Sequence, residues 1–104
     1  MAIVERRIQT LHASKFEEFK TWEKKWSAIE TKLGGFEPKR HMGSMFTPDQ
    51  QGTTIWERNW ESLASMEAAY GRMWNDTDAK ALGAQSHTLV SFSRIEIYNV
   101  FELD

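Results

Sequence analysis

Four residues of the sequence have side chains suited to holding a small molecule: His41, Arg58, Trp56 and Trp60. Aromatic walls with a few polar groups are the usual composition of a ligand-binding site. A guanidinium can hold a carboxylate or an enolate, and an imidazole can move a proton near neutral pH. These four are therefore the candidate ligand-binding residues, and His41 and Arg58 are also the candidate catalytic residues.

A plainer interpretation of the same residues is structural. Trp56 and Trp60 would pack against a helix or a partner subunit, with His41 and Arg58 at the rim of the contact. We prefer this interpretation, because neither His41 nor Arg58 lies in a motif that an active site requires.

A hairpin is predicted to bring the four residues together. Residues 36–46 and 53–60 are strand-like, and Pro48, Asp49 and Gly52 between them favour a chain reversal. If Thr47 lies opposite Gly52, the facing pairs are Gly43 with Trp56, His41 with Arg58, and Lys39 with Trp60. All six would share one face of the sheet, and a slip of one residue would divide them between the faces.

Helical patterns flank this hairpin. Apolar residues recur every three or four positions between Phe16 and Leu33, after a capping-box pattern at Ser14 and Glu17 and before Gly34-Gly35. Ser62 is predicted to cap a second amphipathic helix, and Asp76 or Thr77 a further short turn. With strand-like residues 2–10 at the start and 88–103 at the end, the order is β-α-β-β-α-β in an α+β domain.

The last predicted strand is apolar at both alternating sets of positions. Leu89, Ile95, Ile97 and Phe101 form one set, and Val90, Phe92, Tyr98 and Val100 form the other. Such a strand needs cover on both faces, and helices of a small two-layer domain cover only one. Because large exposed apolar patches are rare on soluble monomers, we expect a homodimer.

Composition limits the class of protein. The 104 residues suit one domain spanning residues 1–104, with 40% hydrophobic and 27% charged residues. A net charge of −2 argues against a nucleic-acid partner, and the motif of RNA-recognition domains with the same element order is missing. No apolar run is long enough to span a membrane, so we expect no membrane association. The absence of cysteine fits a reducing compartment, and we expect a cytoplasmic protein.

The histidines do not predict a metal site. His12, His41 and His87 lie far apart, without the spacing that aims two imidazoles from one helix at a metal. A single histidine such as His87 can bind haem, but an isolated surface histidine is the commoner case. We therefore expect no metal and no cofactor.

The local sequence resembles a known group. The stretch 54–70, TIWERNWESLASMEAAY, looks like the strand-to-helix passage of NIPSNAP-like proteins in the dimeric α/β-barrel superfamily, and Glu5-Arg6-Arg7 with the aromatic first helix is similar to the same group. The resemblance implies a ferredoxin-like fold: a four-stranded antiparallel sheet with helices on one face. It also implies two sheets packed face to face in a homodimer, and a cleft beside each sheet.

The resemblance leaves the function open, because the superfamily includes cofactor-free monooxygenases, haem-degrading enzymes, isomerases and decarboxylases. We expect a protein that binds a small apolar or aromatic ligand in the cleft beside the sheet. One alternative is a cofactor-independent monooxygenase or isomerase that uses His41 and Arg58. This alternative needs both side chains at one enclosed cavity. Another alternative is a protein-interaction module.

Overall fold

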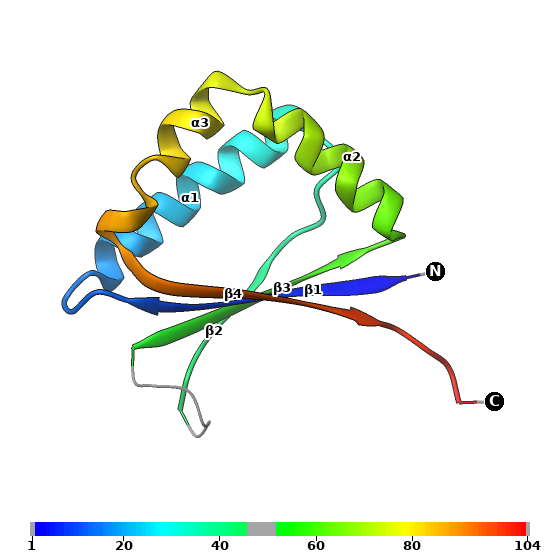
Figure 1. Ribbon diagram of the computed structural model, residues 1–104, viewed down its shortest axis with the longest axis horizontal. Coiled ribbons are helices and arrows are strands. Elements are labelled where there is room, and N and C mark those ends of the chain that lie inside the picture. The colour runs from blue at the N-terminus through cyan, green and yellow to red at the C-terminus, as the bar shows by residue number, and fades with distance from the viewer. Residues whose placement is uncertain (1, 46–51, 104) are drawn as a thin grey trace.

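The computed structural model describes residues 2–45 and 52–103. Its elements are β1 (Ile3–Leu11), α1 (Phe16–Leu33), β2 (Arg40–Gly43), β3 (Thr53–Trp60), α2 (Leu63–Trp74), α3 (Thr77–Gly83), a 3₁₀ turn (Ser86–Thr88) and β4 (Val90–Asn99). The four strands form an antiparallel sheet in the order β2-β3-β1-β4. All three helices lie on one face of this sheet (Figure 1). The predicted ferredoxin-like α+β fold is confirmed.

Capping explains where two of the helices begin. The Ser62 side chain accepts a hydrogen bond from the Ser65 backbone N–H, and the Ser65 hydroxyl accepts one from the Ser62 N–H, so the predicted cap of α2 is confirmed. Asp76 caps α3 through the N–H of Ala79. The predicted capping box at Ser14 is wrong. Ser14 adopts a left-handed turn with φ 62°, and α1 begins at Phe16 with Lys15 as its N-cap residue and without a side-chain cap.

The register of the hairpin differs from the predicted one by two residues. His41 faces Trp56 and Gly43 faces Thr54, and Ser44 N–H donates to the Thr53 carbonyl in the same register. The turn at Thr47 lies outside the described residues. The observed register places Arg40 opposite Glu57, a pair of opposite charges 3.7 Å apart. Because a shift of two residues preserves the faces, His41 still lies on the same side of the sheet as Trp56.

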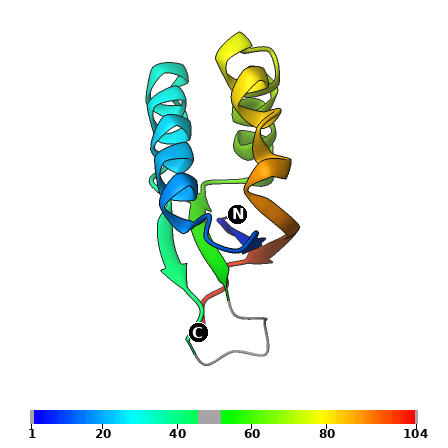
Figure 2. The same ribbon diagram turned by 90° about the vertical axis from the view of Figure 1, so that its left-hand side faces the viewer.

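The apolar core is divided into two parts. One cluster joins the three helices and the start of β4, with buried Phe19, Trp22, Ile29, Met73, Ala79, Leu82 and Leu89. A second cluster joins α2 to the sheet through Ile3, Trp60 and Ala69. Figure 2 shows α1 standing apart from α2 and α3 above the sheet. Polar side chains occupy part of the space between these apolar clusters.

Strand β4 is exposed on both of its faces. Ile95 and Ile97 pair with Arg7 and Glu5 and so share the helix side of the sheet, yet 52% and 42% of their surface is exposed. Phe92 and Tyr98 alternate with them and point away from the helices, with 56% and 45% exposed. The face away from the helices is exposed, as the sequence predicts, but the expected cover of the other face by the helices is incomplete at this edge of the sheet.

Across residues 2–45 and 52–103, no helix combines the length and apolarity that a bilayer crossing requires.

Replacing Leu82 should show how much stability the cluster between the helices supplies. Leu82 is buried in that cluster, so Leu82→Ala leaves a cavity and should lower the free energy of unfolding by about 2–5 kcal/mol. Leu63→Ala is the matched control, because Leu63 is half exposed, and it should change stability by less than about 0.5 kcal/mol. Urea unfolding followed by circular dichroism measures both. Equal losses would contradict the assignment of the core.

Candidate functional site

A row of buried charges lies between the helix layer and the sheet. It contains Glu23 and Glu30 from α1, Lys39 from the segment before β2, and Arg58 from β3, all with side chains at most 10% exposed. Glu23 and Glu30 are seven residues apart, which is two helical turns, so they lie on one face of α1. Their charges alternate in sign along the row, which compensates for their removal from water.

The outer end of this row is the pair of Glu23 and His41. The Nε2 of His41 donates to Glu23 Oε2 at 2.9 Å, and Lys39 Nζ donates to the same oxygen at 3.1 Å. Burial raises the pKa of Glu23, but the hydrogen bond from His41 and the Lys39 ammonium outweigh burial and hold that pKa below its usual value. An ionised carboxylate only accepts hydrogen bonds, so the Nε2 of His41 carries the proton of this bond.

The inner end of the row is Arg58, which is only 1% exposed. Its Nη2 donates to Glu30 Oε2 at 2.7 Å, and Lys39 Nζ lies 3.4 Å from the same oxygen. The rings of Phe36, Trp56 and Trp60 surround the guanidinium, with centroids 5.0, 5.0 and 5.4 Å from Cζ. Such contacts with aromatic faces stabilise a desolvated cation. The guanidinium is therefore fixed in place by one carboxylate and three rings.

A second carboxylate group lies on the sheet. Glu5 of β1 is 2% exposed and accepts hydrogen bonds from Trp60 Nε1 at 2.9 Å and from the Tyr70 hydroxyl at 2.7 and 2.8 Å. Burial raises the pKa of Tyr70, and the nearby Glu5 charge raises it further, so this phenol keeps its proton. These bonds fix α2 to the sheet.

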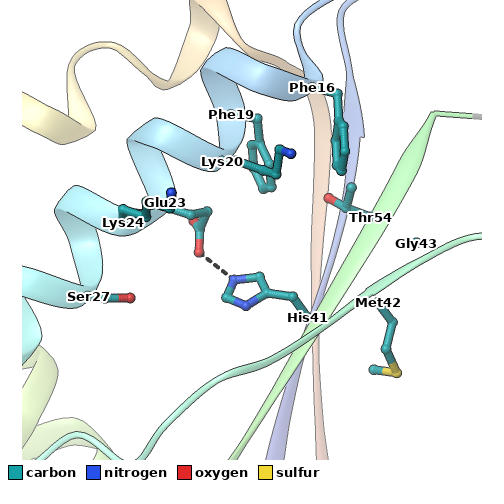
Figure 3. A pocket seen from close by; sticks show the side chains of 10 residues that line it. All are labelled: Phe16, Phe19, Lys20, Glu23, Lys24, Ser27, His41, Met42, Gly43 and Thr54. Atoms are coloured by element: carbon teal, nitrogen blue, oxygen red, sulfur yellow. Dashed lines mark hydrogen bonds and ion pairs between the residues drawn. The ribbon is translucent and has the colours of Figure 1, made fainter.

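The larger of two cavities beside this network, which we call the outer cleft, lies between α1 and the β2 edge of the sheet. It encloses about 360 Å³ and is lined by Phe16, Phe19, Lys20, Glu23, Lys24, Ser27, His41, Met42, Gly43 and Thr54. Figure 3 shows His41 reaching from β2 toward Glu23 on α1, with Phe16 and Phe19 beside them. The surface of the cleft is thus mostly apolar, and its wall carries the Glu23–His41 pair together with Lys20 and Lys24.

The smaller cavity, which we call the inner cavity, lies deeper between α1, α2 and the sheet. Its volume is about 80 Å³, and its lining residues are Arg7, Trp22, Trp26, Glu30, Lys39, Trp56, Arg58, Tyr70, Met73 and Trp74. Among the residues that the structure describes, no group of three histidine or acidic side chains is arranged to hold a metal.

The structure separates the four residues predicted to form one site. His41 lines the outer cleft, with 44% of its side chain exposed, whereas Trp56 and Arg58 line the inner cavity. Trp60 packs in the core between Phe36 and Tyr70. The prediction that Arg58 lies at a rim is wrong, because the Glu30 carboxylate and three aromatic rings allow this cation to be buried. The role of these four residues in ligand binding stays a prediction.

Sequence reasoning missed Glu5, Glu23, Glu30 and Lys39 as parts of the site. One signal was present: Glu30 directly follows the apolar Ile29, and Glu23 directly follows Trp22, so each borders the apolar stripe of its helix. Another was the alternation that places Glu5 on the same face of β1 as the buried Ile3.

Replacing Glu23 should reveal its lowered pKa. The folded state binds this proton less readily than the unfolded state, so the stability due to Glu23 is present above the ordinary glutamate pKa of about 4.3 and is lost as the pH falls through the lowered value. Glu23→Gln should lower the free energy of unfolding by roughly 1.5–3 kcal/mol at pH 7, and by much less at pH 3. Urea titrations between these pH values measure the difference.

The matched control for this substitution is Glu17→Gln. Glu17 is an exposed acid on the same helix, 83% of its side chain is accessible, and it should show little change at any pH. A loss for Glu23→Gln that is the same at pH 7 and pH 3 would refute the assignment.

Comparison with known proteins gives the fold. By sequence, the chain matches no protein-family model and no curated protein. By structure, it is similar to a NIPSNAP family protein from Agrobacterium tumefaciens str. C58, with a TM-score of 0.80 and 20% identity over 98% of this chain and 95% of that chain. A NIPSNAP-like domain protein from Burkholderia xenovorans gives 0.79 at 12% identity, over 99% and 88%.

A third similar structure is SnoaB, a cofactor-independent oxygenase from Streptomyces nogalater. Its TM-score is 0.70 at 12% identity, over 98% of this chain and 95% of that chain. The chain therefore has the ferredoxin-like fold of the NIPSNAP-like proteins, as the resemblance in its strand-to-helix passage predicted.

Proposed function

We propose that the protein binds a small apolar or aromatic molecule in the outer cleft. The observation that carries this proposal is the cleft itself: about 360 Å³ of space beside Phe16, Phe19 and Gly43, with a wall surface that is mostly apolar. Ligand sites of small molecules occupy about 300–1,000 Å³ and combine apolar walls with a few polar groups. A molecule with one or two fused rings fits this volume and these walls.

His41 gives the cleft its polar recognition. The Glu23 carboxylate favours the tautomer of His41 that has its proton on Nε2, and in that neutral tautomer Nδ1 can accept a hydrogen bond from a ligand hydroxyl. Among the described residues, Nδ1 has no protein partner. A phenol or an enol is the ligand chemistry that satisfies both the aromatic wall and this acceptor.

The alternative function is that of a cofactor-independent monooxygenase or isomerase. It is supported by the same His41, because a base that removes a proton from an enolisable aromatic substrate can start either reaction. SnoaB, which has a similar structure, is a cofactor-independent oxygenase. An oxygen electrode distinguishes binding from oxygenation: a bound hydroxynaphthalene that leaves the oxygen concentration unchanged excludes its oxygenation by this protein.

We also propose that two copies of the chain pair through the sheet face opposite the helices. This face carries Val4, Ile8, Ile55, Phe92 and Tyr98, which alternate with the residues that face the helices. Arg6 lies among them and bonds Glu57 at 2.9 Å. A second copy would cover the exposed Phe92 and Tyr98, whose aromatic rings are typical of protein interfaces. The cytoplasmic location stays a prediction from composition.

Filling the outer cleft should abolish ligand binding. Nothing lies within 4 Å of a Cβ built on Gly43, so Gly43→Val places two methyl groups in the cleft without a clash. The affinity for 2-naphthol, measured by calorimetry, should fall by about tenfold or more, the loss expected when a ligand is sterically displaced. Ser93→Val is the control, since Ser93 is an exposed strand residue on β4, away from the cleft. Unchanged affinity in Gly43→Val would refute this location.

Sedimentation velocity at micromolar concentration should give the mass of two chains. Phe92→Glu introduces a charge into the proposed interface and should give the mass of one chain, because two buried carboxylates would face an apolar contact. Leu63→Glu is the matched control, since Leu63 is exposed to a similar extent, on α2. A monomeric wild type would contradict the homodimer and favour the interaction-module alternative, in which another protein covers the sheet.

A further inference from the structure

The inner cavity has a strongly positive lining. Arg7, Lys39 and Arg58 contribute three cations to it, and Glu30 contributes one carboxylate. The other acidic groups of the network, Glu5 and Glu23, do not belong to this lining. An anion that enters the cavity therefore meets an excess of positive charge in a place screened from bulk water, where electrostatic attraction is strong.

The arginines also have hydrogen-bond donors that no group of the protein satisfies. Among the described residues, Nε and Nη1 of Arg58 and Nε of Arg7 are buried without a hydrogen-bond partner. Glu30 takes up only Nη2 of Arg58. Buried donors of a charged group are rarely left unpaired in a native protein, and each unpaired donor is costly. An oxygen ligand in the cavity would remove this cost.

We propose that the inner cavity binds the carboxylate of a small aromatic acid. A carboxylate carries its charge on two oxygens, and each oxygen can accept a hydrogen bond from an N–H of a charged donor. The free Nε–H and Nη1–H of Arg58 point in different directions, because the N–H parallel to Nε–H belongs to Nη2, which Glu30 occupies. Arg58 is held in place by Glu30 and three aromatic rings, so the directions of its two free donor groups are fixed before a ligand binds. Arg7 supplies a third donor from the neighbouring strand.

The surroundings of the cavity select an aromatic acid. About 80 Å³ accommodates a carboxylate and the start of its substituent, and the remainder of the molecule must lie toward the opening. Trp26 is partly buried and Trp74 is 66% exposed, so these two indoles lie on the solvent side of the lining. They offer faces against which an aryl ring can pack.

This site is distinct from the outer cleft. The two sets of lining residues have no member in common, and the row from Glu23 through Lys39 to Glu30 separates them. The proposal therefore does not depend on the proposed function, and either can fail without the other.

The test is a titration of the full chain with benzoate, with benzamide as the uncharged analogue of the same shape. Four of the five tryptophans line the inner cavity, so tryptophan fluorescence and calorimetry both report binding there. We expect saturable binding of one benzoate per chain and an affinity for benzamide lower by about tenfold or more. No saturable binding of benzoate, or equal affinities for the two compounds, would overturn the proposal.

Variants locate the bound carboxylate. Arg7→Gln should weaken benzoate binding by about tenfold or more, whereas Arg6→Gln, on the same strand but the opposite face, should leave it unchanged. Arg58→Lys, which keeps the charge and removes the free Nε–H and Nη1–H donors, should weaken it as well. If Arg58→Lys does not fold, Arg7→Gln decides the question alone.

The outer cleft supplies the last control. Gly43→Val should leave benzoate binding unchanged, because Gly43 lines only the outer cleft of the two cavities. Loss of benzoate binding in Gly43→Val with normal binding in Arg7→Gln would place the compound in the outer cleft and overturn the inner site. Weaker naphthol binding in Gly43→Val with unchanged benzoate binding would support both sites.

Discussion

The ion pair between Arg58 and Glu30 determines how the helix layer and the sheet meet. Both side chains are long, one projects from β3 and the other from α1, and their charged ends touch at 2.7 Å. The apolar clusters lie on either side of this contact, one among the helices and one between α2 and the sheet. Because charged groups occupy the middle of the domain, apolar packing does not close it, and both cavities lie beside this row of charges.

The buried charges favour one placement of the helix layer on the sheet, and they contribute less to the free energy of folding. Desolvation of buried charges cancels most of their mutual attraction, so an ion pair of this kind adds little net stability. Removing one partner is costly, however, because the remaining charge is buried alone. Lys39 lies between Glu23 and Glu30 and contacts both carboxylates. These two ion pairs hold the segment before β2 against α1, and a shifted register of the chain would lose them.

Local sequence patterns predicted the helices and strands. The hairpin register and the buried charges depend on contacts between residues that are far apart in the sequence, so the sequence did not reveal them. The spacing of apolar residues in α1 and the caps at Ser62 and Asp76 involve residues only a few positions apart, so they can be recognised from the sequence alone. The burial of Glu5 depends on Trp60 and Tyr70, more than fifty residues away. The hairpin register likewise depends on pairing with residues of other strands. The fold was therefore predictable, whereas the buried network was not.

The separation of His41 from Arg58 limits the chemistry available to the protein. His41 stands on β2, the edge strand, and is half exposed, whereas Arg58 stands on β3, inside the sheet, and is buried. Three intervening side chains connect them, so they cannot act on the same atom of one small substrate. An enzyme built on this frame would use the imidazole in the outer cleft with Glu23 as its charged hydrogen-bond partner. It would have to stabilise a developing enolate without the guanidinium, and the fixed tautomer of His41 then becomes the feature on which any such reaction depends.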